Sequence, residues 1–197
     1  MKKDKTSIIV GILYIIATVA FSIAMIILDQ KLKGNLITSQ SSIIIASVLI
    51  LIDAVAVTGI GLFLYKVLKK YSKSLALSFT CARVLEGTIF AANAIILFML
   101  ATTVGANTLF SAYNWTFLVG YGLVFAISAL ILNWVLFKSR FVPRWLSGWG
   151  FISAIFVLAN FLLQIFGIFM FEFLDFSIAI QEMVFAGFLI IKGFKAR

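Results

Sequence analysis

Residues 81–87 read Cys-Ala-Arg-Val-Leu-Glu-Gly and lie inside an apolar run from Leu75 to Leu100. A run of about 20 apolar residues is long enough to cross a bilayer as a helix. Arg83 and Glu86 are three residues apart, so they share one face of this predicted helix. Ionisable side chains are costly in hydrocarbon and mark functional candidates by default. We therefore expect the other spans to surround this pair.

The composition indicates a membrane protein along the whole chain. Hydrophobic residues make up 63% of the 197 residues, charged residues 12%, and the mean hydropathy is +1.18. A soluble domain is about half apolar and about a quarter charged. We predict an all-α, polytopic transmembrane bundle of six helices, with residues 1–197 forming one integral membrane domain. The predicted spans are residues 7–28, 43–65, 75–100, 113–137, 148–171 and 174–191.

The basic residues predict the topology. The net charge is +9, but the lysines and arginines gather at span ends, where they meet lipid headgroups rather than form a nucleic-acid surface. The amino terminus, the loops after the second and fourth predicted spans, and the carboxyl tail are all basic. The positive-inside rule therefore places both termini in the cytoplasm. Membrane lipids are the expected partners, and the oligomeric state is left open.

The absence of histidine limits the chemistry. With no histidine and one cysteine, Cys81, the chain has no Cys/His zinc site, no histidine base and no internal disulfide. Cys81 falls inside a span, where cysteine behaves as a small apolar residue. We expect no metal and no cofactor.

Four ionisable residues from three predicted spans fall at similar depths. Arg83 and Glu182 each lie ten residues from the basic end of their spans, a depth of about 15 Å at the helical rise per residue. Glu86 lies one turn deeper than Arg83, and Asp53 lies about 20 Å deep by the same rise. Because lipid exposure is unfavourable for each of them, we expect them to face inward and meet.

Polar amides occur on the same spans or at the same depth. Asn93 shares the helical face of Arg83 and Glu86, while Asn160 and Gln164 are one turn apart on another span. We predict a site that binds a ligand or a proton. Its candidate residues are Arg83, Glu86, Glu182, Asp53, Asn93, Asn160, Gln164 and Gln181.

The charges in this group do not balance. Three acids and one arginine cannot all be ionised in a dry interior, so some acids hold protons, a cation binds, or water enters. The structural alternative is a polar knot that fixes helix register, with the amides completing its hydrogen bonds.

Other features predict packing and boundaries. Gly59, Gly61 and Gly87 allow close approach of a second helix. Residues 143–150 read Pro-Arg-Trp-Leu-Ser-Gly-Trp-Gly and are typical of an interfacial aromatic anchor, with Ser147 as the predicted cap of the following span. Residues 29–42, 102–112 and 172–175 are predicted to be loops, the last of them acidic.

Several of these motifs together resemble a bacterial family of multi-pass membrane proteins known only as a domain of unknown function. They are Gly-Ile-Leu-Tyr at residues 11–14, Arg-Val-Leu-Glu-Gly at 83–87, Pro-Arg-Trp-Leu-Ser at 143–147 with Trp149-Gly150, and Gln181-Glu182 followed by Lys-Gly-Phe at 192–194. The resemblance implies a bacterial inner-membrane protein and supports Arg83, Glu86 and Glu182 as site residues. It implies no activity, and Asp53 is outside its pattern.

Three classes of function stay open. The buried acids and arginine favour a protein that binds or carries a small molecule or an ion with proton linkage. The alternative is an accessory, sensor or structural protein that binds lipid or a partner helix. An intramembrane enzyme is least favoured, because no nucleophile stands beside a base. Catalysis by paired carboxylates remains open to it.

Overall fold

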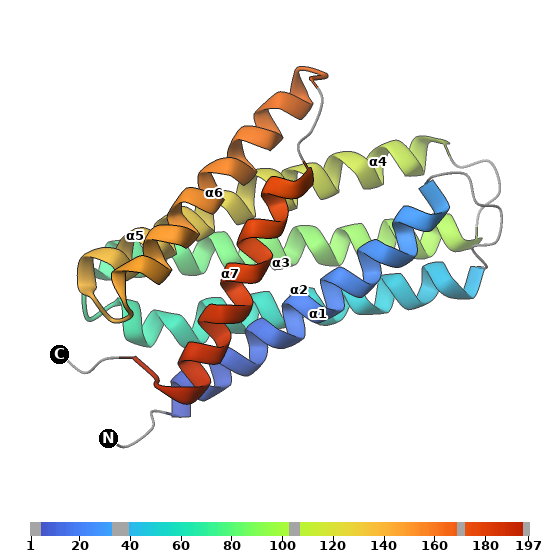
Figure 1. Ribbon diagram of the computed structural model, residues 1–197. Helices are drawn as coiled ribbons and strands as arrows, with labels where there is room; N and C mark the ends of the chain where they lie inside the picture. The colour runs from blue at the N-terminus through green and yellow to red at the C-terminus, as the bar shows by residue number, and fades with distance from the viewer. Residues whose placement is uncertain (1–4, 33–39, 103–106, 169–171, 195–197) are drawn as a thin grey trace.

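The protein is a bundle of helices in the computed structural model, which describes residues 5–32, 40–102, 107–168 and 172–194 (Figure 1). No strand occurs among these residues. The helices are α1 (Lys5–Leu32), α2 (Gln40–Leu68), α3 (Lys73–Thr102), α4 (Asn107–Phe117), the π-helical segment η1 (Leu118–Phe125), α5 (Ala126–Ser139), α6 (Arg144–Ile165) and α7 (Glu172–Ile191). Because α4, η1 and α5 follow one another without a break, the described chain forms six rods, as predicted.

Five of these rods are long and apolar enough to cross a membrane. The apolar part of α7, Phe176–Ile191, is shorter than the other five. Long apolar helices satisfy every backbone polar group internally, which a bilayer requires. The protein is therefore a multi-pass membrane protein built only of helices in its described part.

Several helices extend into predicted loops. α1 continues to Leu32 and α2 begins at Gln40, so the predicted loop 29–42 was too long; residues 33–39 lie outside the described residues. α4 begins at Asn107, inside the predicted loop 102–112. The predicted loop at 172–175 was wrong, because α7 begins at Glu172. Acidic residues in a first helical turn are favoured by the helix dipole, so they are poor evidence for a loop.

The start of α6 corrects the prediction of its cap. The carbonyl of Pro143 accepts hydrogen bonds from the amides of Leu146 and Ser147, so the helix begins at Arg144 and not at residue 148. Ser147 therefore lies inside the first turns, where its hydroxyl donates to the Arg144 carbonyl. Proline at the edge of a helix stops the preceding helix and leaves the next one free to begin.

The end of α6 also differs from the predicted span 148–171. The helix ends at Ile165, and Gly167 takes a positive φ of 69°. The amide of Ile168 then bonds to the carbonyl of Leu163, which is the 6→1 bond of a Schellman motif. Glycine is favoured at such a position because it has no Cβ. Residues 169–171 lie outside the described residues.

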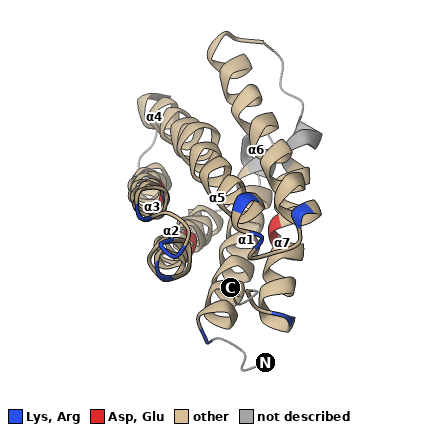
Figure 2. Cartoon of the chain, turned by 90° about the vertical axis from the view of Figure 1, so that its left-hand side faces the viewer, with Lys and Arg blue, Asp and Glu red and all other residues tan. Residues whose placement is uncertain are grey.

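Both termini lie at the same end of the bundle, next to the α2–α3 and α5–α6 connections (Figure 1). We call this the terminal end and the opposite one the distal end. Figure 2 views the terminal end, where many lysines and arginines gather. The described members are Lys5, Lys66, Lys69, Lys70, Lys73, Lys138, Arg140, Arg144 and Lys192. Which side of the membrane this end faces stays a prediction.

The helices pack most closely around α2 and α3. A Cβ added at Gly61 would come 2.8 Å from the Cβ of Arg83, and one at Gly87 would come 2.7 Å from the Ala54 carbonyl oxygen. The prediction of close helix approach at these glycines is confirmed. This contact brings the backbone of α2 directly against the stretch that carries Arg83.

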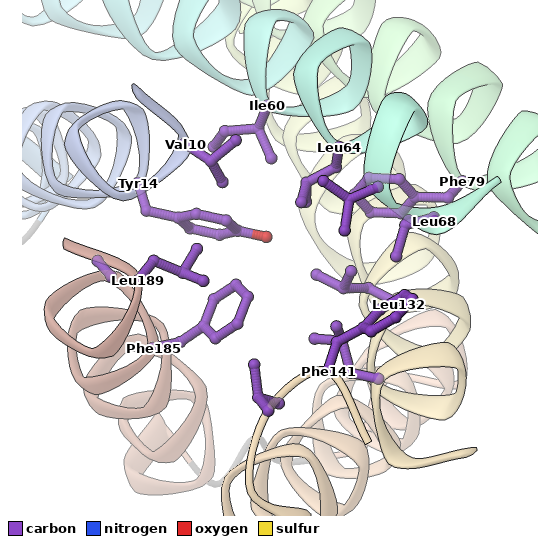
Figure 3. Packing of buried hydrophobic residues seen from close by; sticks show 14 of the residues in the cluster. Val10, Tyr14, Ile60, Leu64, Leu68, Phe79, Leu132, Phe141, Phe185 and Leu189 are labelled. Carbon is purple, nitrogen blue, oxygen red and sulfur yellow. The ribbon is translucent and has the colours of Figure 1, made fainter. Parts of the chain in front are cut away.

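Apolar side chains fill the bundle between Arg83 and the terminal end (Figure 3). They come from α1, α2, α3, α5, α6 and α7, together with the α5–α6 connection. We call this set the terminal core. Its large members are Val10, Tyr14, Ile60, Leu64, Leu68, Phe79, Leu132, Leu136, Phe141, Leu146, Phe185 and Leu189.

Candidate functional site

The predicted ion pair of α3 is formed and buried. Arg83 Nη1 donates to Glu86 Oε1 at 3.1 Å and to Oε2 at 3.3 Å. The side chains of Arg83 and Glu86 are 2% and 1% exposed. An arginine and a glutamate three residues apart can meet on one helix face, which the sequence spacing predicts. Ser128 of α5 donates a further hydrogen bond to Glu86 Oε2 at 3.3 Å.

Glu182 reaches the same arginine from α7. Its Oε1 lies 3.7 Å from Arg83 Nη2, and Thr18 of α1 donates to its Oε2 at 3.5 Å. Arg83 Nη2 also donates to the hydroxyl of Tyr14 at 3.4 Å. The predicted convergence of Arg83, Glu86 and Glu182 is therefore present in the geometry, and it joins α1, α3, α5 and α7.

Asp53 of α2 is buried near this group, with an exposed fraction of 3%. It lies within electrostatic range of Glu86, Glu182 and Arg83. Among the described residues, no hydrogen bond or ion pair reaches its carboxylate. We call Arg83, Glu86, Glu182 and Asp53 the Arg83 cluster. When all four groups are ionised, this cluster carries an excess of two negative charges.

Aromatic rings enclose the guanidinium of Arg83. Its Cζ lies 5.8 Å from the ring centre of Tyr14, 5.6 Å from that of Phe79 and 5.3 Å from that of Phe125. A cation within about 6 Å of an aromatic ring centre is attracted to the ring. These rings therefore stabilise the charged arginine where water is scarce.

A small cavity of about 10 Å³ lies beside the cluster. Its polar walls are Tyr14, Arg83, Asn133, Gln181 and Glu182. About 10–15 Å³ is the space that one water molecule needs. Arg83 Nε, a donor, has no hydrogen-bond partner among the described residues, and a single water molecule is the largest partner that this space would admit. We call this the inner cavity.

Two of the predicted amides help to define this site or its surroundings. Gln181 lines the inner cavity while its Nε2 donates to the Leu146 carbonyl at 3.3 Å. Asn93 instead lies toward α4, where its Nδ2 donates to the Tyr113 carbonyl at 3.0 Å and to Thr116 Oγ1 at 2.8 Å. Asn93 thus fastens α4 to α3 and makes no contact with Arg83.

The two predicted amides of α6 lie elsewhere. Asn160 is buried in the bundle, with an exposed fraction of 2%. Gln164, one turn nearer the distal end, lines a second cavity of about 480 Å³ between α4 and α6. We call it the outer cavity.

Sequence reasoning missed several residues of the site. Tyr14 and Thr18 lie one helical turn apart on α1, and because neither is charged they were not among the predicted site residues. Ser128 and Asn133 lie on α5, which carries no charged residue near them. Their place depends on how α5 packs, and no local pattern in the sequence reports that.

These observations define the class of protein: a six-helix integral membrane protein with a buried cluster of carboxylates around one arginine. The chain belongs to the family described as Domain of unknown function (DUF4386), which matches residues 9–193. The resemblance found in the sequence motifs is thereby confirmed at the level of the family. No curated protein and no solved structure matches the chain.

Proposed function

We propose that this protein binds a proton or one small cation at the Arg83 cluster, as a proton-linked binding or carrier protein of the bacterial cytoplasmic membrane. The observation that carries the proposal is the excess of acid. One guanidinium faces three carboxylates, of which Asp53 and Glu86 are buried and Glu182 is 17% exposed, and the two glutamates contact it. A buried charge without a partner is strongly unfavourable. A positive species, rather than an anion, is what this cluster lacks.

The size of the inner cavity further limits which species can bind at the cluster. At about 10 Å³ it holds a water molecule and nothing larger. A proton needs no more room, since it binds to a carboxylate or travels with one water. A larger molecule would need the helices to separate. The closed conformation therefore favours a proton as the species bound at the cluster.

Infrared spectroscopy of the protein in lipid nanodiscs tests this proposal. A pH-difference spectrum should contain a band from a protonated carboxyl group. At least one of the variants Asp53→Asn, Glu86→Gln and Glu182→Gln should lose this band. Glu172→Gln, at the start of the same helix as Glu182, should keep the band. If the wild-type protein gives no such band, or if all three cluster variants retain it, the proposal is wrong.

A structural role is the second candidate, favoured by the number of helices that the cluster joins. In that case the acid-to-amide variants should change the temperature of unfolding without changing proton uptake. Proteoliposomes with a trapped pH dye separate the two roles. Under our proposal Glu182→Gln loses proton movement while the protein stays folded.

A further inference from the structure

The outer cavity lies in the distal half of the bundle, beside the first part of the α4–η1–α5 rod. It lies between α4 and the start of η1 on one side and the end of α6 on the other. Figure 1 shows α6 diverging from α4 toward its end. The lining residues are Asn114, Trp115, Phe117, Leu118, Gln164, Gly167 and Ile168. No lysine, arginine, aspartate or glutamate is among them, but two carboxamides are.

The terminal side of the Arg83 cluster is filled by apolar side chains. Between the Arg83 cluster and the terminal end stands the terminal core, a layer of buried apolar side chains (Figure 3). Leu64, Leu68 and Leu136 are each at most 1% exposed. Apart from the hydroxyl of Tyr14, which contacts Arg83, the side chains of this layer offer no polar partner for a water or an ion. Access from the terminal end is therefore blocked in this conformation.

On the distal side, stacked aromatic rings separate the outer cavity from Arg83. Phe117 lines the cavity, and its ring centre lies 5.7 Å from that of Tyr121. The ring of Tyr121 stacks on Phe125 at 5.3 Å, and Phe125 lies 5.3 Å from the Arg83 guanidinium. Phe21 of α1 stacks on Phe117 and on Tyr121. We call these four rings the aromatic column.

The column is built on an irregular helix. Tyr121 and Phe125 belong to η1, and π-helical segments within α-helices are frequent at functional sites. Gly120 and Gly122 lie in the same segment. A Cβ at Gly122 would come 2.7 Å from the ring of Phe161, so α6 packs directly on the η1 backbone. A change in η1 would therefore move the rings and α6 together.

We propose that the outer cavity is a water-filled access route to the Arg83 cluster from the distal end, and that the aromatic column is its closed gate. The route carries water and protons, or a small hydrated cation. This inference rests on the proposed function, because it supplies the path by which that ligand reaches the cluster.

The chemistry of the outer cavity favours water over lipid chains. Asn114 and Gln164 line it, and a carboxamide without a hydrogen-bonding partner is costly in hydrocarbon. The 22 residues of α6 span about 33 Å along the helix at the helical rise, about the thickness of the hydrocarbon core of a bilayer.

Cysteine accessibility tests the route. The single native cysteine is removed as Cys81→Ser, and Gln164→Cys is compared with Ile165→Cys, whose side chain is exposed on the outside of the same turn. A membrane-impermeant thiosulfonate reacts with thiolates, which form in water. We expect the Gln164→Cys thiol to react roughly tenfold faster, and from the distal side. Equal rates, or a faster reaction from the terminal side, would overturn the route.

A second pair of variants tests the gate. Ser128→Cys, one turn beyond Phe125, should be unreactive in the closed protein and become reactive when Tyr121→Ala or Phe117→Ala opens the column. Ile127→Cys, on the exposed face of α5, should not change. If Ser128→Cys stays unreactive in both opened variants while the Gln164→Cys thiol reacts, the aromatic column is not the gate. Cysteine reaction reports water and the infrared band reports the cluster, so either proposal can fail without the other.

Discussion

At the scale of single residues, Arg83 is the most constrained side chain of the protein. It is 2% exposed and touches Glu86, Glu182 and Tyr14 while three rings surround its guanidinium. The backbone of α2 at Gly61 lies directly against the Cβ of Arg83. A residue held in this way cannot be removed without leaving its partners unpaired.

Removing Arg83 alone should therefore destabilise the protein more than removing Arg83 and Glu86 together. Arg83→Ala leaves Glu86 and Glu182 without their cation, and breaking a buried ion pair from one side costs about 3–5 kcal/mol. The double variant Arg83→Ala, Glu86→Ala removes one charge of each sign, so we expect it to unfold at a higher temperature than Arg83→Ala. Thermal unfolding in detergent gives both values. A double variant less stable than the single one would contradict the importance of this pair.

At the scale of helices, the long rod α4–η1–α5 holds the least regular structure in the described chain. Its outer part is tied to α3 by Asn93, and its middle carries the aromatic column. The sequence predicted a single span at 113–137 because the hydrophobic run is continuous. Neither proline nor charge marks η1, so no signal in the sequence predicted the switch from α to π geometry, which occurs where Gly120 and Gly122 pack against α3 and α6.

We expect Asn93 to stabilise the packing of α4 against α3 and to play no part in the Arg83 cluster. Asn93→Ala removes two hydrogen bonds and leaves the Tyr113 carbonyl and Thr116 with fewer partners. A lost buried hydrogen bond costs about 1–3 kcal/mol. We expect the free energy of unfolding to fall by that order while the infrared carboxyl band stays unchanged.

The matched control for Asn93 is Thr88→Ala on the same helix. The Thr88 hydroxyl is exposed and bonds only to the Val84 carbonyl of its own turn, so stability should change little. Loss of the carboxyl band in Asn93→Ala would instead place Asn93 within the proton site, which was the interpretation from sequence.

At the scale of the whole molecule, the sequence predicted the class, the rods and the meeting of Arg83, Glu86 and Glu182. These follow from strong physical terms: apolar length, helical spacing and the cost of a charge in lipid. Tyr14, Ser128 and the inner cavity could not be predicted in this way. Their positions depend on the angles at which six apolar helices cross. Those angles are set by how the shapes of apolar side chains fit together, which a pattern of polarity along the sequence does not predict.

The orientation of the bundle is the last prediction, and it follows from the charges at its ends. The terminal end carries nine described lysines and arginines, counted from Lys5 to Lys192, whereas the distal end has Lys31 and Lys33 as its basic residues in the sequence. Lysine and arginine resist transfer across the membrane, so the terminal end should face the cytoplasm. The outer cavity would then open away from the cytoplasm.

Reporter fusions decide this orientation. A reporter at Lys70 or at Arg140 should read as cytoplasmic, and one at Gly34 or at Asn107 as external. The connections that carry them alternate along the chain, so four concordant results would also confirm that α2, α3 and the α4–η1–α5 rod cross the membrane. An external reading at Lys70 would reverse the bundle. The outer cavity would then face the cytoplasm, and protons would reach the Arg83 cluster from inside the cell.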